Sequence, residues 1–247
     1  MKDPLALMNI QAEVLYIHDS RGRITSINEH SRHPAPRLFW GQTRQGSVLR
    51  FRSDVPDAIV DRIVHTSSNG GASSQMASIM DALQRHESIR SMWLGPAYVF
   101  AASAAEAAVA ARDGVVCAGS SQPPESHACN GAVKVTDDNR AYLKDSFKEL
   151  WTDVLHREPC YMMIEDEKAV SVCFSARATS QAAEAGVETL EGYRGKGHAI
   201  AVATAWSEAV RQSGRIPLYS TSWDNYDSQS LAERLKVTQY GTDFSFY

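Results

Sequence analysis

The stretch Tyr193-Arg194-Gly195-Lys196-Gly197-His198-Ala199 decides which fold this chain of 247 residues is expected to adopt. It follows a strand-like run at 186–190 and precedes a run with strong helix content at 199–212. The backbone N–H groups of such a turn point outward, and the dipole of the following helix favours negative charge there. Arg194 and Lys196 add two full positive charges. The sequence therefore predicts an anion-binding site between a strand and a helix.

The spacing of the glycines separates this turn from two common phosphate-binding loops. A nucleotide P-loop needs Gly-Lys followed by Ser or Thr, whereas Gly197 follows Lys196 here. A dinucleotide-binding loop needs Gly-x-Gly-x-x-Gly, whereas Gly192, Gly195 and Gly197 have the opposite spacing. The turn is therefore expected to bind a different phosphate-containing ligand.

The order Arg194-x-x-Gly197-x-Ala199 resembles the pyrophosphate loop of the GNAT superfamily of acyl-coenzyme A N-acyltransferases. That family has Arg or Gln, two residues, Gly, one residue, then Gly or Ala. Further on, Asn225-x-x-Ser228-x-x-Leu231-x-x-x-Leu235 is similar to the family segment Asn-x-x-Ala/Ser-x-x-Leu-Tyr-x-x-Leu-Gly-Phe. The chain departs from it at Ala232, where many relatives have the Tyr that protonates the leaving thiolate, and at Lys236-Val237. The resemblance covers roughly residues 136–247.

The resemblance implies an α/β fold of the α+β kind, with a mixed, mostly antiparallel, splayed sheet and flanking helices. The elements expected from the residue pattern have the matching order: a helix at 138–155, strands at 160–164, 169–174 and 182–190, a helix at 199–212, a strand at 217–221, a helix capped by Asp224 or Asn225 through Leu235, and a strand at 238–246. This core is slightly short of complete. The first part of the chain must then supply the missing strands. One interpretation of that part is a decayed second copy of the core.

The first part of the chain is expected to be a divergent α/β half. Residues 119–131 are rich in Ser, Pro and Gly, which predicts a boundary between a half at 1–130 and a core at 131–247. The pattern within the first half predicts strands at 13–18 and 23–27 around a hairpin turn, strands at 37–40 and 47–52, a helix from Asp54 through Val64, a loop at 69–74, a helix at 75–86, a strand at 98–100 and a helix at 101–111.

The resemblance implies that acetyl-coenzyme A is the cofactor. Backbone N–H groups of the splayed strand 187–190 would hold the thioester carbonyl and its developing oxyanion. In that family an Asn side chain at this place contacts the pantetheine arm, which implies the same contact for Asn225, although a helix cap is an equally good interpretation of that residue alone. The cofactor-binding residues predicted in this way are Val187, Thr189, Leu190, Arg194, Gly195, Lys196, Gly197, His198, Ala199, Asn225 and Ser228.

The expected reaction is direct attack of an amine on the thioester, with a carboxylate taking the ammonium proton. Such a base contributes about 10²–10⁴-fold. Glu184 and Glu188 are the candidates, because residues four apart in an unbroken strand share one face. Glu184 is preferred because it lies where relatives often place the base, although either residue could equally belong to the polar face of an edge strand. Tyr226 is the candidate for protonating the thiolate, with simple packing as the alternative.

The acceptor is expected to be a small-molecule amine. Trp223 could pack on a sugar face, and the hairpin turn with Glu165 and Asp166 could pair with ammonium groups, unless the turn is only a solvated tip. Residues 136–247 hold 17 acidic against 12 basic residues, which suits a cationic acceptor. The general layout is similar to the aminoglycoside 2′-N-acetyltransferases that inactivate kasugamycin. A metabolite amine or amino acid as acceptor, and a non-catalytic coenzyme A-binding module, are the alternatives.

Composition excludes several other classes of protein. A net charge of −4 argues against nucleic acid as the main partner. No apolar run approaches ~18 residues, so no membrane span is expected. The start Met1-Lys2-Asp3-Pro4 lacks a signal-like apolar region, so we expect a cytoplasmic protein. The four cysteines lack C-x-x-C spacing and the histidines are scattered, which predicts reduced thiols and no metal site. A homodimer is left open.

Overall fold

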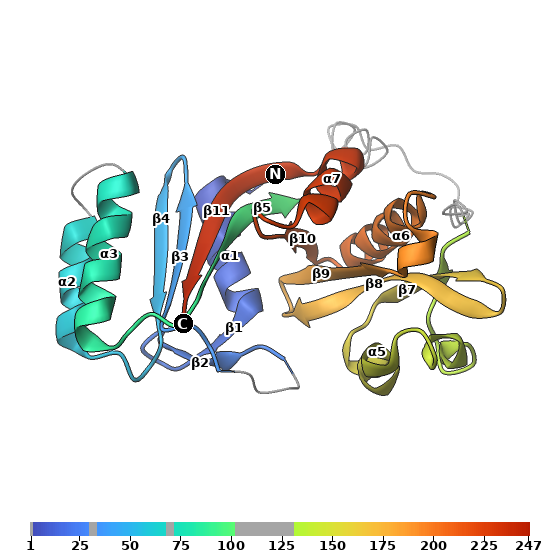
Figure 1. Ribbon diagram of the computed structural model, residues 1–247, viewed down its shortest axis with the longest axis horizontal. Helices are drawn as coiled ribbons and strands as arrows, with labels where there is room; N and C mark the ends of the chain where they lie inside the picture. Colours follow the sequence, from blue (N-terminus) through green and yellow to red (C-terminus); the bar gives the residue numbers. More distant parts are fainter. Residues whose placement is uncertain (1, 30–33, 68–71, 102–130) are drawn as a thin grey trace, which may run out of the picture.

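A computed structural model describes residues 2–29, 34–67, 72–101 and 131–247. Within these ranges one nine-stranded sheet has the order β4-β3-β11-β5-β10-β9-β8-β7-β6, and β1 and β2 form a separate small sheet. The large sheet is mixed and mostly antiparallel: β9 and β10 run parallel, and the other neighbouring strands pair antiparallel. Helices flank it along its length (Figure 1). The expected α+β fold with a mixed sheet is confirmed.

The carboxyl-terminal part of the chain builds one end of the sheet. Helix α6 packs against one face of this end, and α5 with its neighbouring turns packs against the other (Figure 1). Two apolar clusters result, one on each side of β8. The elements are β6 (Val133–Lys134), α5 (Lys148–Asp153), β7 (Cys160–Glu165), β8 (Lys168–Ala178), β9 (Ala182–Thr189), α6 (His198–Gln212), β10 (Ile216–Ser220), α7 (Tyr226–Leu235) and β11 (Thr238–Phe246).

The amino-terminal part builds the opposite end. Helices α2 and α3 cover one face of it (Figure 1), while α1 contacts β3, β4, β11 and β9. The elements are α1 (Pro4–Leu15), β1 (Tyr16–His18), β2 (Ile24–Ile27), β3 (Leu38–Thr43), β4 (Gly46–Phe51), α2 (Asp57–Ser67), α3 (Ala72–His86) and β5 (Met92–Val99).

Strands from the two parts of the chain alternate in the middle of the sheet. Strand β5, from the first part, lies between β10 and β11, and β11 in turn lies between β5 and β3. A Cβ atom on Gly95 of β5 would lie 1.8 Å from the carbonyl oxygen of Thr221, so the close approach of β5 to the end of β10 requires glycine. The expectation that the first half supplies strands to the core is confirmed. The boundary at residue 130, and an origin as a second copy, remain predictions.

One expected strand is in part a helix. Residues 13–15 were expected to begin a strand ending at His18, but they complete α1, and only Tyr16–His18 are extended. The side chain of Asp3 caps α1 by accepting a hydrogen bond from the N–H of Ala6 at 3.0 Å. The helix is apolar on most sides and buried, so it lacks the amphipathic pattern by which a helix is usually predicted.

The helix expected at 138–155 is broken. It consists of a 3₁₀ turn at Arg140–Leu143, then α5, then a second 3₁₀ turn at Val154–His156. Phe147 interrupts it with φ −133° and ψ 63°. The break lets Leu143, Phe147 and Leu150 enter one apolar cluster under β7 and β8.

Three other predicted elements differ from the observed ones at their ends, and two predicted segments cannot be compared with the structure. Helix α2 begins at Asp57 rather than near Asp54, α3 begins inside the loop expected at 69–74, and β5 is longer than the strand expected at 98–100. Apart from Ala101 and Gly131, the helix expected at 101–111 and the boundary segment at 119–131 lie outside the described residues.

Two further features concern the described residues alone. Cys160 and Cys173 are buried free thiols. None of the helices in these ranges combines the length and apolar character needed to cross a bilayer.

Candidate functional site

A groove of about 620 Å³ opens where β9 and β10 diverge. The parallel register of these strands runs from Ile216 opposite Ala182 to Leu218 opposite Glu184, and β9 continues to Thr189. Residues from both faces of the sheet line the groove: Phe147 lies on the α5 side, and the start of α6 lies on the other side. A ligand in this groove can therefore reach from one face of the sheet towards the other through the gap between the strands.

The Gly-rich turn forms one wall of the groove. Gly195 and Gly197 have φ values of 77° and 88°, a left-handed conformation that favours glycine. Gly197 is the N-cap residue of α6, so the positive end of the helix dipole faces the groove at His198 and Ala199. This geometry suits a pyrophosphate, as the sequence predicts.

The cations of the turn are held by carboxylates. Arg194 Nη1 lies 3.1 Å from Asp227 Oδ2, and Lys196 Nζ lies 3.1 Å from Glu165 Oε2. His198 Nε2 lies 2.9 Å from Glu165 Oε1. The hydrogen bond from Lys196 lowers the pKa of the Glu165 carboxyl, and His198 contributes to the same effect. Exposed ion pairs stabilise by at most about 1 kcal/mol, so an incoming diphosphate can compete with these carboxylates.

Two residues predicted to bind the acceptor therefore lie beside the turn. Glu165 contacts Lys196 and His198, and Asp166 accepts a hydrogen bond from the Tyr193 hydroxyl at 3.4 Å. These contacts favour a role for Glu165 at the cofactor turn. Its role towards the acceptor remains a prediction.

The start of α7 forms the opposite wall. Asn225 is the N-cap residue, and its Oδ1 accepts a hydrogen bond from the N–H of Ser228 at 3.0 Å. Both residues line the groove, so the structure brings them together with the Gly-rich turn. The helix cap and the predicted pantetheine contact are compatible roles, because the cap uses the amide oxygen of Asn225 and leaves its NH₂ group as a donor.

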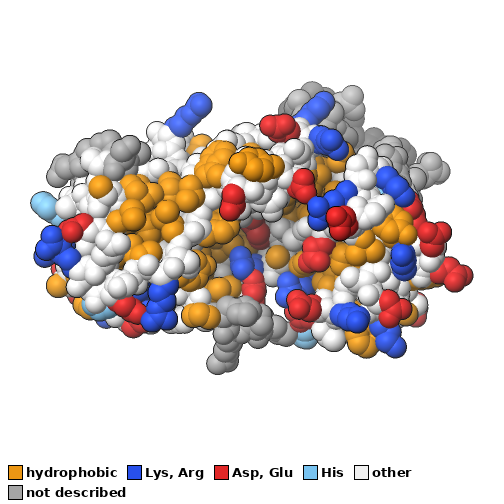
Figure 2. Space-filling view, in the orientation of Figure 1, with side chains coloured by type: hydrophobic (Ala, Val, Ile, Leu, Met, Phe, Trp, Pro, Cys, Tyr) orange, Lys and Arg blue, Asp and Glu red, His pale blue; other side chains and the backbone are white. Residues whose placement is uncertain are grey.

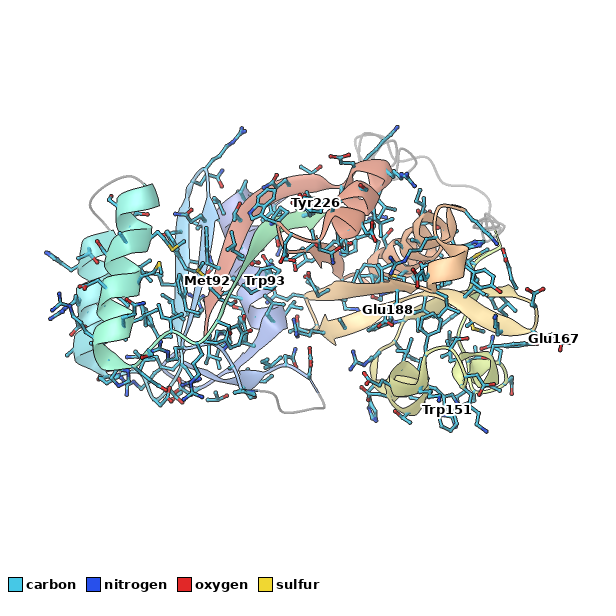
Figure 3. The ribbon with its side chains drawn as sticks, viewed as in Figure 1. Met92, Trp93, Trp151, Glu167, Glu188 and Tyr226 are labelled. Atoms are coloured by element: carbon cyan, nitrogen blue, oxygen red, sulfur yellow. The ribbon has the colours of Figure 1, made fainter. Side chains whose placement is uncertain are left out.

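The two candidate bases occupy different places on β9. Glu184 lies at the closed end of the splay, is 4% exposed, and accepts a 2.6 Å hydrogen bond at Oε1 from Ser220 Oγ. Its burial raises the pKa of its carboxyl to about 7. Glu188 lies further along β9, lines the groove and is exposed (Figure 3). Desolvation raises the pKa of Glu188, and Glu149 raises it further.

A buried polar cluster formed by α1 and β11 lies beside Glu184. Gln11 of α1 donates a 2.5 Å hydrogen bond from Nε2 to Asp243 Oδ2 and accepts one of 2.8 Å from the Tyr240 hydroxyl. Burial, and then the charge of Glu184, raise the pKa of Asp243 well above its usual value. The sequence reasoning missed this cluster. Its signal was Asp243, the one charged residue in the strand Thr238–Phe246.

Tyr226 and Trp223 lie towards solvent. Tyr226 is 76% exposed at the start of α7 and is not among the residues that line the groove (Figure 3). Trp223 is 43% exposed, and its backbone N–H donates to the carbonyl oxygen of Leu94 at 3.2 Å, which places it against the start of β5. The buried hydroxyl that does line the groove belongs to Tyr219, which the sequence reasoning did not single out.

Charged side chains surround the middle of the molecule. Figure 2 shows acidic and basic groups intermixed around the hollow between its two ends. Arg177 of β8 pairs with Glu29, and Arg177 also lowers the pKa of Glu184, although less than burial raises it. The described residues contain no group of three or more His, Cys, Asp or Glu side chains placed to hold a metal ion.

Comparisons with known proteins give one family. Residues 132–241 match the family model described as GNAT acetyltransferase. A search of curated protein sequences found no match.

Solved structures of GNAT proteins resemble the chain at low identity. A GNAT-family protein of Novosphingobium aromaticivorans is 14% identical with a TM-score of 0.42, and the alignment covers 64% of this chain and 65% of that one, so this chain spans just under two thirds of it. An acetyltransferase of Colwellia psychrerythraea is 11% identical with a TM-score of 0.47, covering 81% and 75%. The aminoglycoside N-acetyltransferase AAC(6′)-Iy in complex with CoA is 15% identical with a TM-score of 0.35, covering 42% and 88%. These values are too low to indicate a substrate.

The family match spans the Gly-rich turn, the splayed strands and the capped α7 that together form the groove. Residues 132–241, the part of the chain that forms the groove, are therefore similar to the GNAT acetyltransferase family.

Proposed function

We propose that this protein transfers the acetyl group of acetyl-coenzyme A to a primary amine of a small molecule by direct attack. One observation carries the proposal. The groove between β9 and β10 joins a Gly-rich turn and helix N-terminus, suited to a pyrophosphate, to the strand that holds a buried carboxylate with a pKa raised to about 7.

Each part of the groove has a task in this reaction. The turn at 194–199 and the start of α6 bind the pyrophosphate. The pantetheine arm runs between β9 and α7, past Asn225 and Ser228. Backbone N–H groups of β9 from Val187 onward, where β9 has left β10, hold the thioester carbonyl oxygen as it becomes an oxyanion.

Glu184 is the proposed base. The attacking nitrogen forms a bond to the carbonyl carbon, the carbon–sulfur bond breaks, and its electron pair stays on sulfur. The proton that the ammonium loses passes to Glu184, directly or through a water. A base whose pKa lies near neutral pH suits this step, since it is part ionised at pH 7 and still binds a proton well.

The finer proposal is that the acceptor is a cationic amino sugar of the aminoglycoside type, such as kasugamycin. Its support is the acidic balance of residues 136–247, with 17 acidic against 12 basic residues, and the carboxylates of Glu184 and Glu188 on the strand that would hold the thioester. Attraction beyond about 8 Å is screened at physiological salt, so such pairing must be close.

Mass spectrometry on the purified protein tests both levels of the proposal. With acetyl-coenzyme A, we expect an aminoglycoside to gain one acetyl group in place of a proton and one thiol to be released per turnover. If only polyamines or amino acids are modified, the acceptor is a metabolite amine. If coenzyme A binds but no amine in the panel is acetylated, the chain is a coenzyme A-binding module and acetyl transfer is excluded as its function.

A further inference from the structure

Tyr219 lies at the point where the splay opens. It follows Leu218, the last residue of β10 that is in register with β9, and it remains paired with Tyr98 of β5 on its other side. Its side chain is 4% exposed and lines the groove. A phenol is therefore built into the gap that the reactive end of the cofactor must enter.

The hydroxyl of Tyr219 is fixed in position. Its ring packs with those of Tyr98 and Phe100, at centroid distances of 6.3 and 6.5 Å. Its hydroxyl is hydrogen-bonded to Ser228 Oγ, and it donates a long hydrogen bond of 3.4 Å to the Ser228 carbonyl oxygen. Because Ser228 Oγ can donate to the phenol oxygen, the phenol proton can turn to a second acceptor in the groove.

The leaving sulfur needs a hydrogen-bond donor, and α7 places no phenol in the lining of the groove. Ala232 is buried and carries only a methyl group, and Tyr226 is 76% exposed outside the groove. We propose that the Tyr219 hydroxyl donates a hydrogen bond to the sulfur of coenzyme A as the carbon–sulfur bond breaks, with Ser228 Oγ supporting the phenol from behind. This inference rests on the proposed function, and it makes Tyr219 a catalytic residue.

The donor stabilises the thiolate without giving up its proton. Burial raises the pKa of Tyr219 to about 12, so the phenol stays protonated while a thiol ionises near 8.5. The electron pair of the broken bond remains on sulfur as a thiolate. The proton that finally converts it to the thiol comes from solvent or from the proton released by the amine, so the reaction balances.

A titration of bound coenzyme A tests this without any acceptor. The ultraviolet absorbance of the thiolate is followed against pH, with desulfo-coenzyme A, which lacks the thiol, as the blank. A hydrogen bond to a charged group is strong, so Tyr219→Phe should raise the thiol pKa of bound coenzyme A by about 1 to 2 pH units, a 10- to 100-fold lower thiolate fraction. The matched control is Tyr98→Phe, which removes a neighbouring phenol outside the groove lining and should leave that pKa unchanged.

Each outcome decides the inference. If both variants leave the thiol pKa where it is, or both shift it equally, Tyr219 does not contact the sulfur. If Tyr219→Phe does not fold, fluorotyrosine at position 219 is used, since its more acidic phenol should lower the thiol pKa further, and no change would overturn the inference. If the unaltered protein does not bind coenzyme A at all, the proposed function fails instead.

Discussion

Ser220 Oγ donates a 2.6 Å hydrogen bond to Oε1 of Glu184, while Oε2 of the same carboxylate is buried and has no hydrogen-bond partner among the described residues. One oxygen is thus fixed and the other can accept a proton. The hydrogen bond lowers the pKa of Glu184, but burial outweighs it and raises that pKa to about 7. The environment of Glu184 therefore fits a general base better than an ion pair.

Replacing the proposed base should slow the chemical step. We expect Glu184→Gln to lower kcat by roughly 10²-fold or more, because Gln cannot take the ammonium proton, and to leave the affinity for acetyl-coenzyme A little changed. Steady-state kinetics and calorimetry measure the two quantities. Glu188→Gln is the control, and a large loss of kcat in this variant alone would identify Glu188 as the base.

The raised pKa also predicts opposite effects of pH on activity and stability. The rate constant kcat/KM should rise with pH and level off above about pH 7, as Glu184 ionises. Stability should fall over the same range. Between pH 4.5, the ordinary pKa of the group, and about pH 7, the folded protein keeps a proton that the unfolded chain has lost, so the free energy of unfolding falls as the pH rises. Above about pH 7 this loss of stability is complete and amounts to about 3 kcal/mol.

Thermal unfolding of Glu184→Gln checks the stability effect. Gln resembles the protonated acid, so the variant should match the parent protein near pH 4.5 and exceed its melting temperature increasingly towards pH 8. A difference that is constant across this range would show that Glu184 is ionised throughout in the folded protein.

A substitution of Glu165 tests whether this carboxylate competes with the cofactor for the basic groups of the Gly-rich turn. Because it holds Lys196 and His198, Glu165→Gln should release these groups for phosphate and tighten coenzyme A binding by up to about 5-fold, the range of an exposed ion pair. Asp227→Asn, which releases Arg194, should act in the same direction. An unchanged cofactor affinity together with a raised KM for the amine would instead show that Glu165 binds the acceptor.

Burial and the nearby Glu184 both raise the pKa of Asp243, which favours its protonated form, and an asparagine resembles that form. Asp243→Asn should therefore keep both the stability and the pH midpoint of activity. Asp243→Ala should cost about 1–3 kcal/mol, because the buried amide of Gln11 loses its partner. Chemical denaturation and pH–rate profiles are the measurements. A lower pH midpoint in Asp243→Asn would show that Asp243 carries a charge that holds the pKa of Glu184 up.

Local signals explain what the sequence could predict. The Gly-rich turn, the cap at Asn225 and the strands from Cys160 to Thr189 depend on neighbouring residues. Each begins within a residue of its expected place, although β8 continues four residues beyond its expected end. Helix α1 was missed because it is apolar on most sides, and the helix at 138–155 was overextended because its apolar spacing continues across the break at Phe147.

The rest depends on contacts between distant parts of the chain. Gln11 and Asp243, which are joined by a hydrogen bond, lie 232 residues apart in the sequence. Strand β5 comes from the first half of the chain but lies beside β10 in the sheet. No local pattern indicates that Tyr219 rather than Tyr226 faces the groove. That difference follows from the register of β10 in the sheet and from the exposed start of α7.

The central claim is that the turn at the start of α6 binds coenzyme A, and calorimetry of Gly197→Glu tests it most directly. The variant places a negative charge at the N-terminus of α6, in the left-handed position that the pyrophosphate approaches. Its control is Gly22→Glu, which adds the same charge at φ 72° in an equally open position outside the groove lining. We predict that Gly197→Glu abolishes measurable coenzyme A binding while Gly22→Glu retains it, with both proteins folded. Equal and undiminished affinity in the two variants would contradict the account.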